Sequence, residues 1–342
     1  MLATPVDGPT QSHQLRRGWR PVTWLVLQLQ GQSSLRSASH WGTGALGHAR
    51  RPPVGSPANT HEVSSHVLVL SASGLGQACV ETLVEAGGYV AVLDMNEENG
   101  AELVSKLGSQ TKFFVCNVLE TESIRAAVDG AVEWVKKTGK PLGGVIPAAG
   151  VSTPATVRIR GFLGEKQSTC HNMLTMDQML DRDGNALDLS DFDFVMNVNL
   201  RGTIDLVRQS LVHIAKTEPT RPDGERGVVI MVASSAAFDG QKGQVSYSAS
   251  KGAVTAMTLP MTRDLARYGV RVITIAPSLF ESRMTSMMSD KVRGSLEKAM
   301  EFPRRAGQPA EFAALAKHAI ENAMLNGTVL RLDGGMRMPS KM

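Results

Sequence analysis

Residues 67–76 read VLVLSASGLG, a short apolar run followed by a turn of small residues. A brief, continuously apolar run is typical of a parallel strand that is buried on both faces of a sheet. Gly74 and Gly76 let the backbone approach a phosphate at the start of the helix expected over 77–86. Strand, glycine turn and helix in this order favour a dinucleotide-binding α/β domain, although glycine-rich turns are common and are weak evidence by themselves.

The alternation of strand and helix continues along the chain. It predicts a Rossmann-type α/β fold, in which helices cover both faces of a doubly wound, seven-stranded parallel sheet. We expect a single domain over residues 66–342. The other expected strands are 89–93, 112–115, 144–147, 227–232, 270–275 and 329–332, and the other expected helices are 97–107, 120–137, 192–216, 247–267 and 311–324.

Asp94 ends the second expected strand, downstream of the glycine turn. In a dinucleotide-binding fold, an acidic residue about twenty residues after the turn binds the ribose hydroxyls of the adenosine. Its negative charge would repel the 2′-phosphate of NADP, so Asp94 favours NAD as the cofactor. The alternative is that Asp94 only caps the helix that follows.

Tyr247 and Lys251 lie four residues apart in the sequence YSASK, at the start of an expected helix. This spacing places them on one helix face. A free tyrosine has a pKa near 10, and a neighbouring ammonium group would stabilise the phenolate and lower that pKa. The pair therefore predicts a proton donor and acceptor.

Two further polar residues lie upstream of this pair. Ser234 follows the strand expected over 227–232 and could hold a substrate oxygen beside Tyr247. Asn199 lies inside the helix expected over 192–216, where a buried amide is either a structural kink or part of a polar relay.

Together these residues resemble the pattern of the short-chain dehydrogenase/reductases, a Tyr-x-x-x-Lys pair with an upstream Ser and Asn. The resemblance covers residues 67–338, and its most specific stretches, 233–280 and 325–338, are similar to the branch of the family that acts on 3-hydroxyacyl-CoA. It implies reversible hydride transfer between NAD and a secondary alcohol or ketone, in fatty-acid oxidation. A 3-oxoacyl carrier-protein reductase and a steroid dehydrogenase are the alternatives within the family.

The resemblance also implies roles for single residues. Tyr247 would be the general acid and base, and Lys251 would bind the nicotinamide ribose. Ser234 would orient the substrate oxygen, and Asn199 would hold a water that links Lys251 to solvent. Gln244 would line the substrate pocket together with Ser234 and Tyr247. The implied cofactor-binding residues are Ser73, Gly74, Leu75, Gly76, Asp94, Asn117, Val118, Ala148, Gly150, Tyr247, Lys251, Pro277 and Phe280.

The glycine turn departs from the family pattern Thr-Gly-x-x-x-Gly-x-Gly. Its first two positions are Val69 and Leu70, so the first glycine is missing. A side chain there could crowd the diphosphate of the cofactor. The departure favours a second hypothesis, in which the chain is a cofactor-impaired scaffold subunit of a larger assembly.

The segment 151–190 is long for a connection inside a compact domain. We interpret it as an insertion, which is either a substrate-side lid or a mispredicted intron. The unusual turn at Val69 and Leu70 lies close to an equally unusual leader, which suggests a faulty gene model near residue 66.

The positive charge of the chain is confined to its first residues. The net charge is +4, from 36 Lys and Arg against 32 Asp and Glu. Residues 1–61 hold six Arg, no Lys and one acid, a net of +5, and therefore the remainder has a net of −1. Arg and Ser enrichment with almost no acid fits a mitochondrial transit segment. The alternatives are a disordered extension, with the protein in the cytoplasm, and a wrongly predicted first exon.

Charge, cysteine spacing and the length of apolar runs indicate which classes of partner the chain can bind. The near-neutral body carries no dense basic patch, which argues against nucleic acid as the main partner. Three scattered cysteines, Cys79, Cys116 and Cys170, show no spacing typical of disulfides or of a metal site. No apolar run has the length of a membrane span. We therefore expect a small-molecule substrate such as an acyl-CoA, no metal and no membrane contact. The family resemblance implies a homo-oligomer, often a tetramer.

Overall fold

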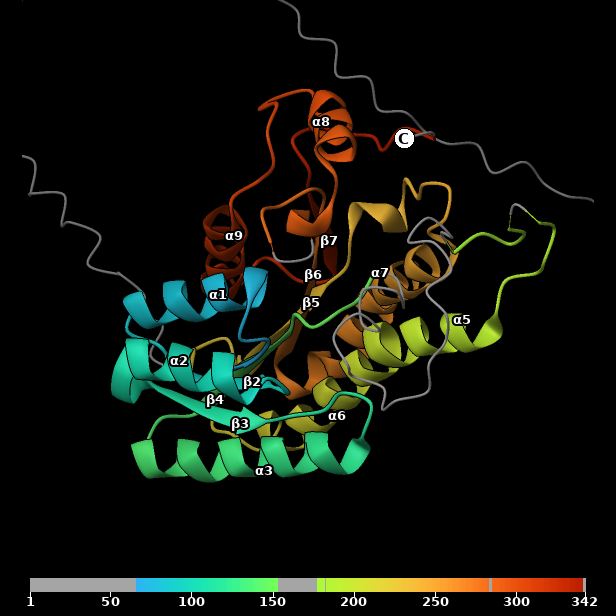
Figure 1. Ribbon diagram of the computed structural model, residues 1–342. Helices are drawn as coiled ribbons and strands as arrows, with labels where there is room; N and C mark the ends of the chain where they lie inside the picture. Colours follow the sequence, from blue (N-terminus) through green and yellow to red (C-terminus); the bar gives the residue numbers. More distant parts are fainter. Residues whose placement is uncertain (1–65, 153–176, 182, 283–284, 341–342) are drawn as a thin grey trace, which may run out of the picture. The chain divides into compact units, whose positions relative to one another are not determined.

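The computed structural model describes residues 66–152, 177–181, 183–282 and 285–340, all of which belong to one compact unit. Seven parallel strands form one sheet in the order β3-β2-β1-β4-β5-β6-β7 (Figure 1). This order is that of a doubly wound dinucleotide-binding sheet, with one added strand at the edge. The predicted seven-stranded α/β fold is therefore confirmed. The strands are β1 (His66–Leu70), β2 (Tyr89–Asp94), β3 (Thr111–Val115), β4 (Leu142–Pro147), β5 (Gly227–Val232), β6 (Val270–Pro277) and β7 (Thr328–Leu332).

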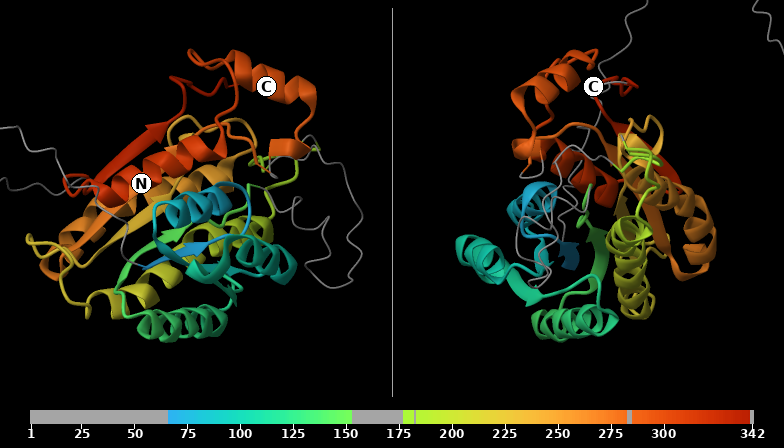
Figure 2. Two further views of the ribbon diagram at one scale, coloured as in Figure 1. Left: turned by 90° about the vertical axis from the view of Figure 1, so that its left-hand side faces the viewer. Right: turned by 45° about the vertical axis from the view of Figure 1, so that its right-hand side comes forward.

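Helices cover both faces of the sheet (Figure 2). One apolar core lies between the sheet and α1, α2 and α9, and a second lies between the opposite face and α3, α6 and α7. The central strands β5 and β6 are buried along their whole length, which explains their continuously apolar sequences. The helices are α1 (Gly74–Glu85), α2 (Glu97–Leu107), α3 (Thr121–Thr138), α5 (Leu189–Met196), α6 (Gly202–Ile214), α7 (Val245–Leu265), α8 (Asp290–Lys298) and α9 (Pro309–Glu321).

The helix expected over 192–216 is wrong as a single element. Its region forms α5, a π-helical turn at Asn197–Arg201 and then α6. A π-turn inserts one extra residue in a helix, and such turns often mark functional sites. Asn199 lies within this turn. Helix α8 was not expected from the sequence, because its residues are mostly polar.

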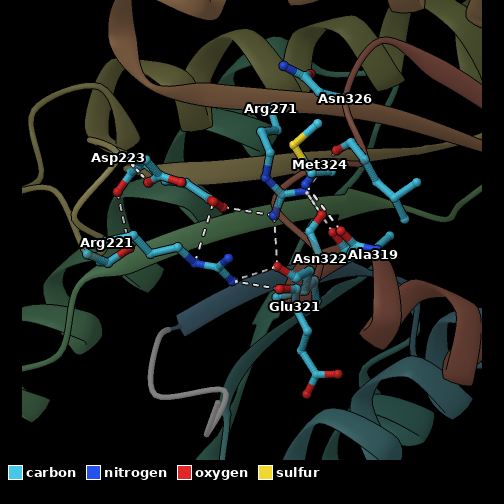
Figure 3. Close-up of polar contacts among 12 residues, drawn as sticks. Arg221, Asp223, Arg271, Ala319, Glu321, Asn322, Met324 and Asn326 are labelled. Carbon is cyan, nitrogen blue, oxygen red and sulfur yellow. Dashed lines mark hydrogen bonds and ion pairs between the residues drawn. The ribbon is translucent and has the colours of Figure 1, made fainter. Parts of the chain in front are cut away.

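A buried arginine links β6 to the end of α9 (Figure 3). Arg271, near the start of β6, forms an ion pair with Glu225 at 2.8 Å. Its guanidinium also donates to the carbonyl oxygens of Ala319 and Ile320 at the end of α9, at 2.8 Å each. Arg271 thereby satisfies carbonyl groups that the last turn of a helix leaves without intrahelical partners. This network lies at the amino end of β6.

Within the described part of the chain, no helix combines the length and the apolar character that crossing a membrane requires. The leader 1–61 and most of the insertion, residues 153–176, lie outside the described residues. The end of the insertion is described: Leu180 and Ala186 form an antiparallel bridge just before α5 begins.

Candidate active site

The turn between β1 and α1 spans Ser71, Ala72 and Ser73. Leu70 pairs with β2 and β4 as the last residue of β1, and the predicted crowding of the diphosphate at this position stays a prediction. A conformation that favours glycine occurs at the next residue, Ser71, whose φ is +149°. The Ser71 hydroxyl donates to the carbonyl oxygen of Ser73 at 3.0 Å and accepts from its N–H at 3.2 Å. These two bonds stabilise a turn that lacks its usual glycine.

The glycines of the turn are required by close contacts. A Cβ on Gly76 would lie 2.7 Å from the Cβ of Ser71. Gly74 adopts a φ of +57° as the first residue of α1. Ser73, the N-cap residue, makes no side-chain capping bond. The first N–H groups of α1 are consequently free of side-chain caps, as an anion-binding helix start requires.

Asp94 ends β2 beside this turn. Its Oδ2 accepts from the N–H of Ala72 at 2.7 Å, and its Oδ1 accepts from the N–H of Asn96 at 2.9 Å. The carboxylate therefore ties the cofactor turn to the end of the neighbouring strand. Asn96, and not Asp94, is the N-cap of α2, which contradicts the alternative reading of Asp94 as a simple cap.

Asn117 follows β3, next along the same edge of the sheet. Its side-chain oxygen accepts from the N–H of Leu119 at 3.1 Å, and its amide donates to Glu120 at 2.8 Å. The amide predicted to contact adenine thus has partners within its own loop. Val118 packs on the core beneath α3 and α6.

Ser234, Tyr247 and Lys251 converge at the carboxyl end of β5. Ser234 is buried, its hydroxyl accepts from the N–H of Ala236 at 3.2 Å, and its side chain interacts with that of Tyr247. Lys251 is also buried, and its ammonium donates to the carbonyl oxygen of Val232 at 3.0 Å. The predicted grouping is thus present, with residues from a strand end and from the first two turns of α7.

The pKa of Tyr247 differs from the expectation. Burial raises the pKa of the phenol above its ordinary value, while the hydrogen bond with Ser234 acts in the opposite direction. The Lys251 ammonium lies 5.9 Å from the centre of the Tyr247 ring. Burial also lowers the pKa of Lys251 from 10.5 to about 8. Burial therefore sets the direction of the Tyr247 pKa in the protein without bound ligands, and the predicted lowering by Lys251 stays a prediction.

Asn199 is fully buried beside these groups. Its side-chain oxygen accepts from the N–H of Val151 at 2.8 Å, and its amide donates to the carbonyl of the same residue at 2.8 Å. The amide also donates to the Ser250 hydroxyl at 3.1 Å. Asn199 therefore joins the π-turn, the end of β4 and α7. Its predicted contact with a water stays a prediction.

Gly150 lies beside the side chains of Asn199 and Lys251 and leaves space there. A Cβ at that position would lie 3.2 Å from the side-chain oxygen of Asn199 and 3.3 Å from the ammonium of Lys251. Ala148, two residues earlier, packs on the core formed with α1 and α9.

Pro277, Phe280 and Gln244 are the remaining predicted site residues. Pro277 is the last residue of β6. The Phe280 ring is buried and packs edge-on against Phe312, with 6.4 Å between ring centres, and its predicted contact with the cofactor stays a prediction. Gln244 precedes α7, and its side-chain oxygen accepts from the N–H of Gln241 at 2.9 Å.

One residue of this region was missed from the sequence. Asp177, at the end of the insertion, is buried and accepts two hydrogen bonds from Ser246, the neighbour of Tyr247. No spacing or periodicity in 151–190 could have singled out this carboxylate.

A nicotinamide dinucleotide fits the residues present. The uncapped start of α1 offers N–H groups for a diphosphate, and the Asp94 carboxylate lies beside it for ribose hydroxyls. Gly150 leaves the approach to Lys251 free of a side chain. All these positions follow the carboxyl ends of strands, where ligands bind in open α/β sheets.

Comparisons with known proteins agree with this geometry. A dehydrogenase described as "3-hydroxyacyl-CoA dehydrogenase type-2" from Bos taurus is 40% identical over 78% of this chain and 92% of its own length. The crystal structure of a protein of the same description from Mycobacterium avium has a TM-score of 0.70 at 31% identity, and covers 82% of this chain and 98% of that one. A 3-ketoacyl-(acyl-carrier-protein) reductase from Brucella melitensis, complexed with NADH, shares the fold with a TM-score of 0.63 at 19% identity, over 80% of this chain and 98% of its own.

The family itself is shown by a match that covers most of the described sheet. The sequence pattern of the family "short chain dehydrogenase" matches residues 65–293, which include the cofactor turn, Asp94, Ser234, Tyr247 and Lys251. The chain belongs to the short-chain dehydrogenase family of oxidoreductases.

Proposed function

We propose that the chain is an NAD-dependent dehydrogenase that interconverts 3-hydroxyacyl-CoA and 3-oxoacyl-CoA in fatty-acid oxidation. The observation that carries the proposal is the grouping of Ser234 and Tyr247 with the buried Lys251 at the carboxyl end of β5. The similarity to type-2 3-hydroxyacyl-CoA dehydrogenases supports the substrate class.

Ser234, Tyr247 and Lys251 have different roles in the proposed proton transfer. Bound NAD supplies the hydride acceptor. Ser234 positions the substrate oxygen, and Tyr247 takes the hydroxyl proton during oxidation and returns it to the carbonyl oxygen during reduction. With a pKa of about 8, Lys251 is mostly a cation at neutral pH, and its charge favours the phenolate that the oxidation needs.

The test is an assay of the full chain with NADH and acetoacetyl-CoA. We expect turnover by the wild type and a fall in kcat of about 10²- to 10⁴-fold in Tyr247→Phe, because the general acid is lost. Tyr268→Phe is the matched control, since Tyr268 is a partly exposed tyrosine beyond the end of α7 whose hydroxyl accepts from Arg267. Absence of turnover in a folded wild type, or full activity of Tyr247→Phe, would contradict the proposal.

The preference for NAD over NADP is part of the proposal. The Asp94 carboxylate already lies at the cofactor turn, and a 2′-phosphate near it would be repelled. We expect Asp94→Ser to lower the ratio of kcat/KM for NADH to that for NADPH. An unchanged ratio would contradict the role of Asp94 in the preference for NAD.

A second function is favoured by the strained turn. Ser71 holds a glycine-type conformation, so the chain could be a cofactor-impaired scaffold subunit of a larger assembly. NAD titration followed by thermal shift separates the two functions, because a bound ligand stabilises the folded state by RT ln(1 + [L]/Kd). A scaffold predicts no shift in the wild type and a shift in Ser71→Gly, whereas a dehydrogenase predicts a shift in both.

The homo-oligomer and the compartment belong to the same proposal. Exposed apolar positions on α7 support association with copies of the chain, and the Arg-rich leader supports a mitochondrial location. A fluorescent fusion of the full chain that stays in the cytoplasm would contradict the location.

A further inference from the structure

Asp177 belongs to the insertion but is bonded to the start of α7. Its side chain is 8% exposed. Its Oδ2 accepts from the N–H of Ser246 at 2.5 Å, and its Oδ1 accepts from the Ser246 hydroxyl at 2.8 Å. The backbone carbonyl of Asp177 also accepts from the N–H of Val245, at 3.4 Å. One residue thus contacts both of the first two residues of α7.

The N-cap residue of α7 does not cap the helix with its own side chain. Gln244 is the N-cap residue of α7 and makes no side-chain capping bond. Its side-chain oxygen accepts instead from the N–H of Gln241, in the preceding loop. The first N–H groups of a helix have no intrahelical partners, and a carboxylate there also interacts favourably with the helix dipole. Asp177 therefore caps α7 from a segment 69 residues earlier in the chain.

The two reactive residues of α7 are fixed by different groups. Lys251 lies in the second turn of the helix and is held by Val232 on β5. Ser250, beside it, is held by Asn199. Tyr247 lies in the first turn, directly after Ser246, and the bonds that fix this turn from outside the helix come from Asp177. The first turn of α7 thus depends on Asp177 for its position, while the Lys251 ammonium depends on the sheet.

We propose that Asp177 is a positioning residue, which holds the first turn of α7 so that Tyr247 meets the substrate oxygen. The inference rests on the proposed dehydrogenase function. A displacement of a reacting group by about 1 Å costs up to about 10²-fold in rate. Asp177 itself takes no part in proton transfer.

The test compares Asp177→Ala and Asp177→Asn with the wild type in the full chain, using NADH and acetoacetyl-CoA. Activities are normalised to the number of NAD sites, and the Kd for NAD is measured by fluorescence titration. We expect Asp177→Ala to lower kcat about tenfold or more while the Kd for NAD changes less than about twofold. Asp177→Asn should restore most of the kcat, because its amide oxygen still accepts from the N–H of Ser246.

Glu311→Ala is the matched control. The Glu311 carboxylate accepts from the N–H of Gln308 at 2.7 Å and so caps α9, a helix that carries no predicted site residue. This variant should lose thermal stability and keep its kcat per NAD site. A purely structural role of Asp177 predicts that Asp177→Ala behaves in the same way, and that result would overturn the inference.

The remaining outcomes separate the inference from the function on which it rests. A wild type without turnover overturns the proposed function and this inference with it. An active wild type with an equally active Asp177→Ala overturns the inference alone. Should Asp177→Ala fail to fold, Asp177→Ser, which also lacks both carboxylate oxygens, takes its place, and an unchanged kcat per NAD site in that variant overturns the inference.

Discussion

Lys251 is a cation that the fold holds away from water. It is 5% exposed, and its ammonium has one described protein acceptor, the carbonyl oxygen of Val232. Burial disfavours the charged form of a group, which is why its pKa falls to about 8. Keeping Lys251 charged, as the proposed reaction requires, consequently has a cost in the stability of the folded state.

This cost makes a prediction about stability and pH. The unfolded chain binds more protons at Lys251 than the folded chain does between pH 8, the folded value, and pH 10.5, the ordinary value. The free energy of unfolding should therefore rise with pH across this window, because stability rises wherever the unfolded state binds more protons. The full effect is at most about 3 kcal/mol.

Urea denaturation of the wild type and of Lys251→Met at several pH values isolates this contribution, since the other ionisable groups are common to both proteins. The stability difference between them should shift in favour of the wild type as pH rises from 8 to 10.5. A difference that is constant over this range would contradict the lowered pKa.

Single residues also show how far the sequence predicts the site. The spacing of Tyr247 and Lys251 predicts one helix face because it follows from helix geometry alone. The direction of the Tyr247 pKa change could not be predicted, because it depends on burial by the surrounding chain. The strand end at Leu70 was predicted from the apolar run, whereas the unusual φ of Ser71 could not be predicted, because the sequence does not show backbone conformation inside a turn.

At the scale of helices and strands, the sequence predicted the bounds of elements that follow from the local spacing of apolar residues. The helix expected over 97–107 has the same bounds as α2, and the strand expected over 227–232 is β5. The π-turn at Asn197–Arg201 was missed because it changes only the hydrogen-bond pattern and leaves the apolar spacing nearly intact. The cap of α7 by Asp177 was missed for a different reason, since the two segments are distant in sequence.

Arg271 links β6 to the end of α9 and to Glu225. We expect Arg271→Ala to lower the free energy of unfolding by about 3–5 kcal/mol, because it leaves the buried Glu225 without its 2.8 Å partner. It also removes the donor that satisfies the carbonyl oxygens at the end of α9. Because Arg271 lies at the amino end of β6 and the site at the carboxyl ends of the strands, the kcat of the folded fraction should be unchanged.

Urea denaturation measures this loss, and Arg125→Ala is the control. Arg125 pairs with Glu122 on the surface of α3, where its side chain is 54% exposed. Pairs of this kind contribute about 0–1 kcal/mol. Equal losses in the two variants would show that the buried network is no more important than a surface pair.

At the scale of the whole molecule, charge and apolar surface suggest how copies of the chain meet. The residues after the leader have a net charge of −1, so the body has little overall charge to oppose association. Helix α7 exposes Val245, Ala249, Ala256 and Leu259. These positions are separated by four, seven and three residues, and helix geometry places them along one face.

We expect this face of α7 to lie in the interface of the proposed homo-oligomer. A helix of 21 residues is about 30 Å long, so two copies that pair along it can contribute a large part of a stable interface. Ala256→Glu places a charge in the middle of the apolar stripe, and should reduce the mass measured by light scattering toward that of the 36.6 kDa monomer. Ala126→Glu, at an exposed alanine of α3, is the matched control and should keep the mass of the wild type. A monomeric wild type would contradict the oligomer, and an Ala256→Glu variant with the wild-type mass would place the interface on another face.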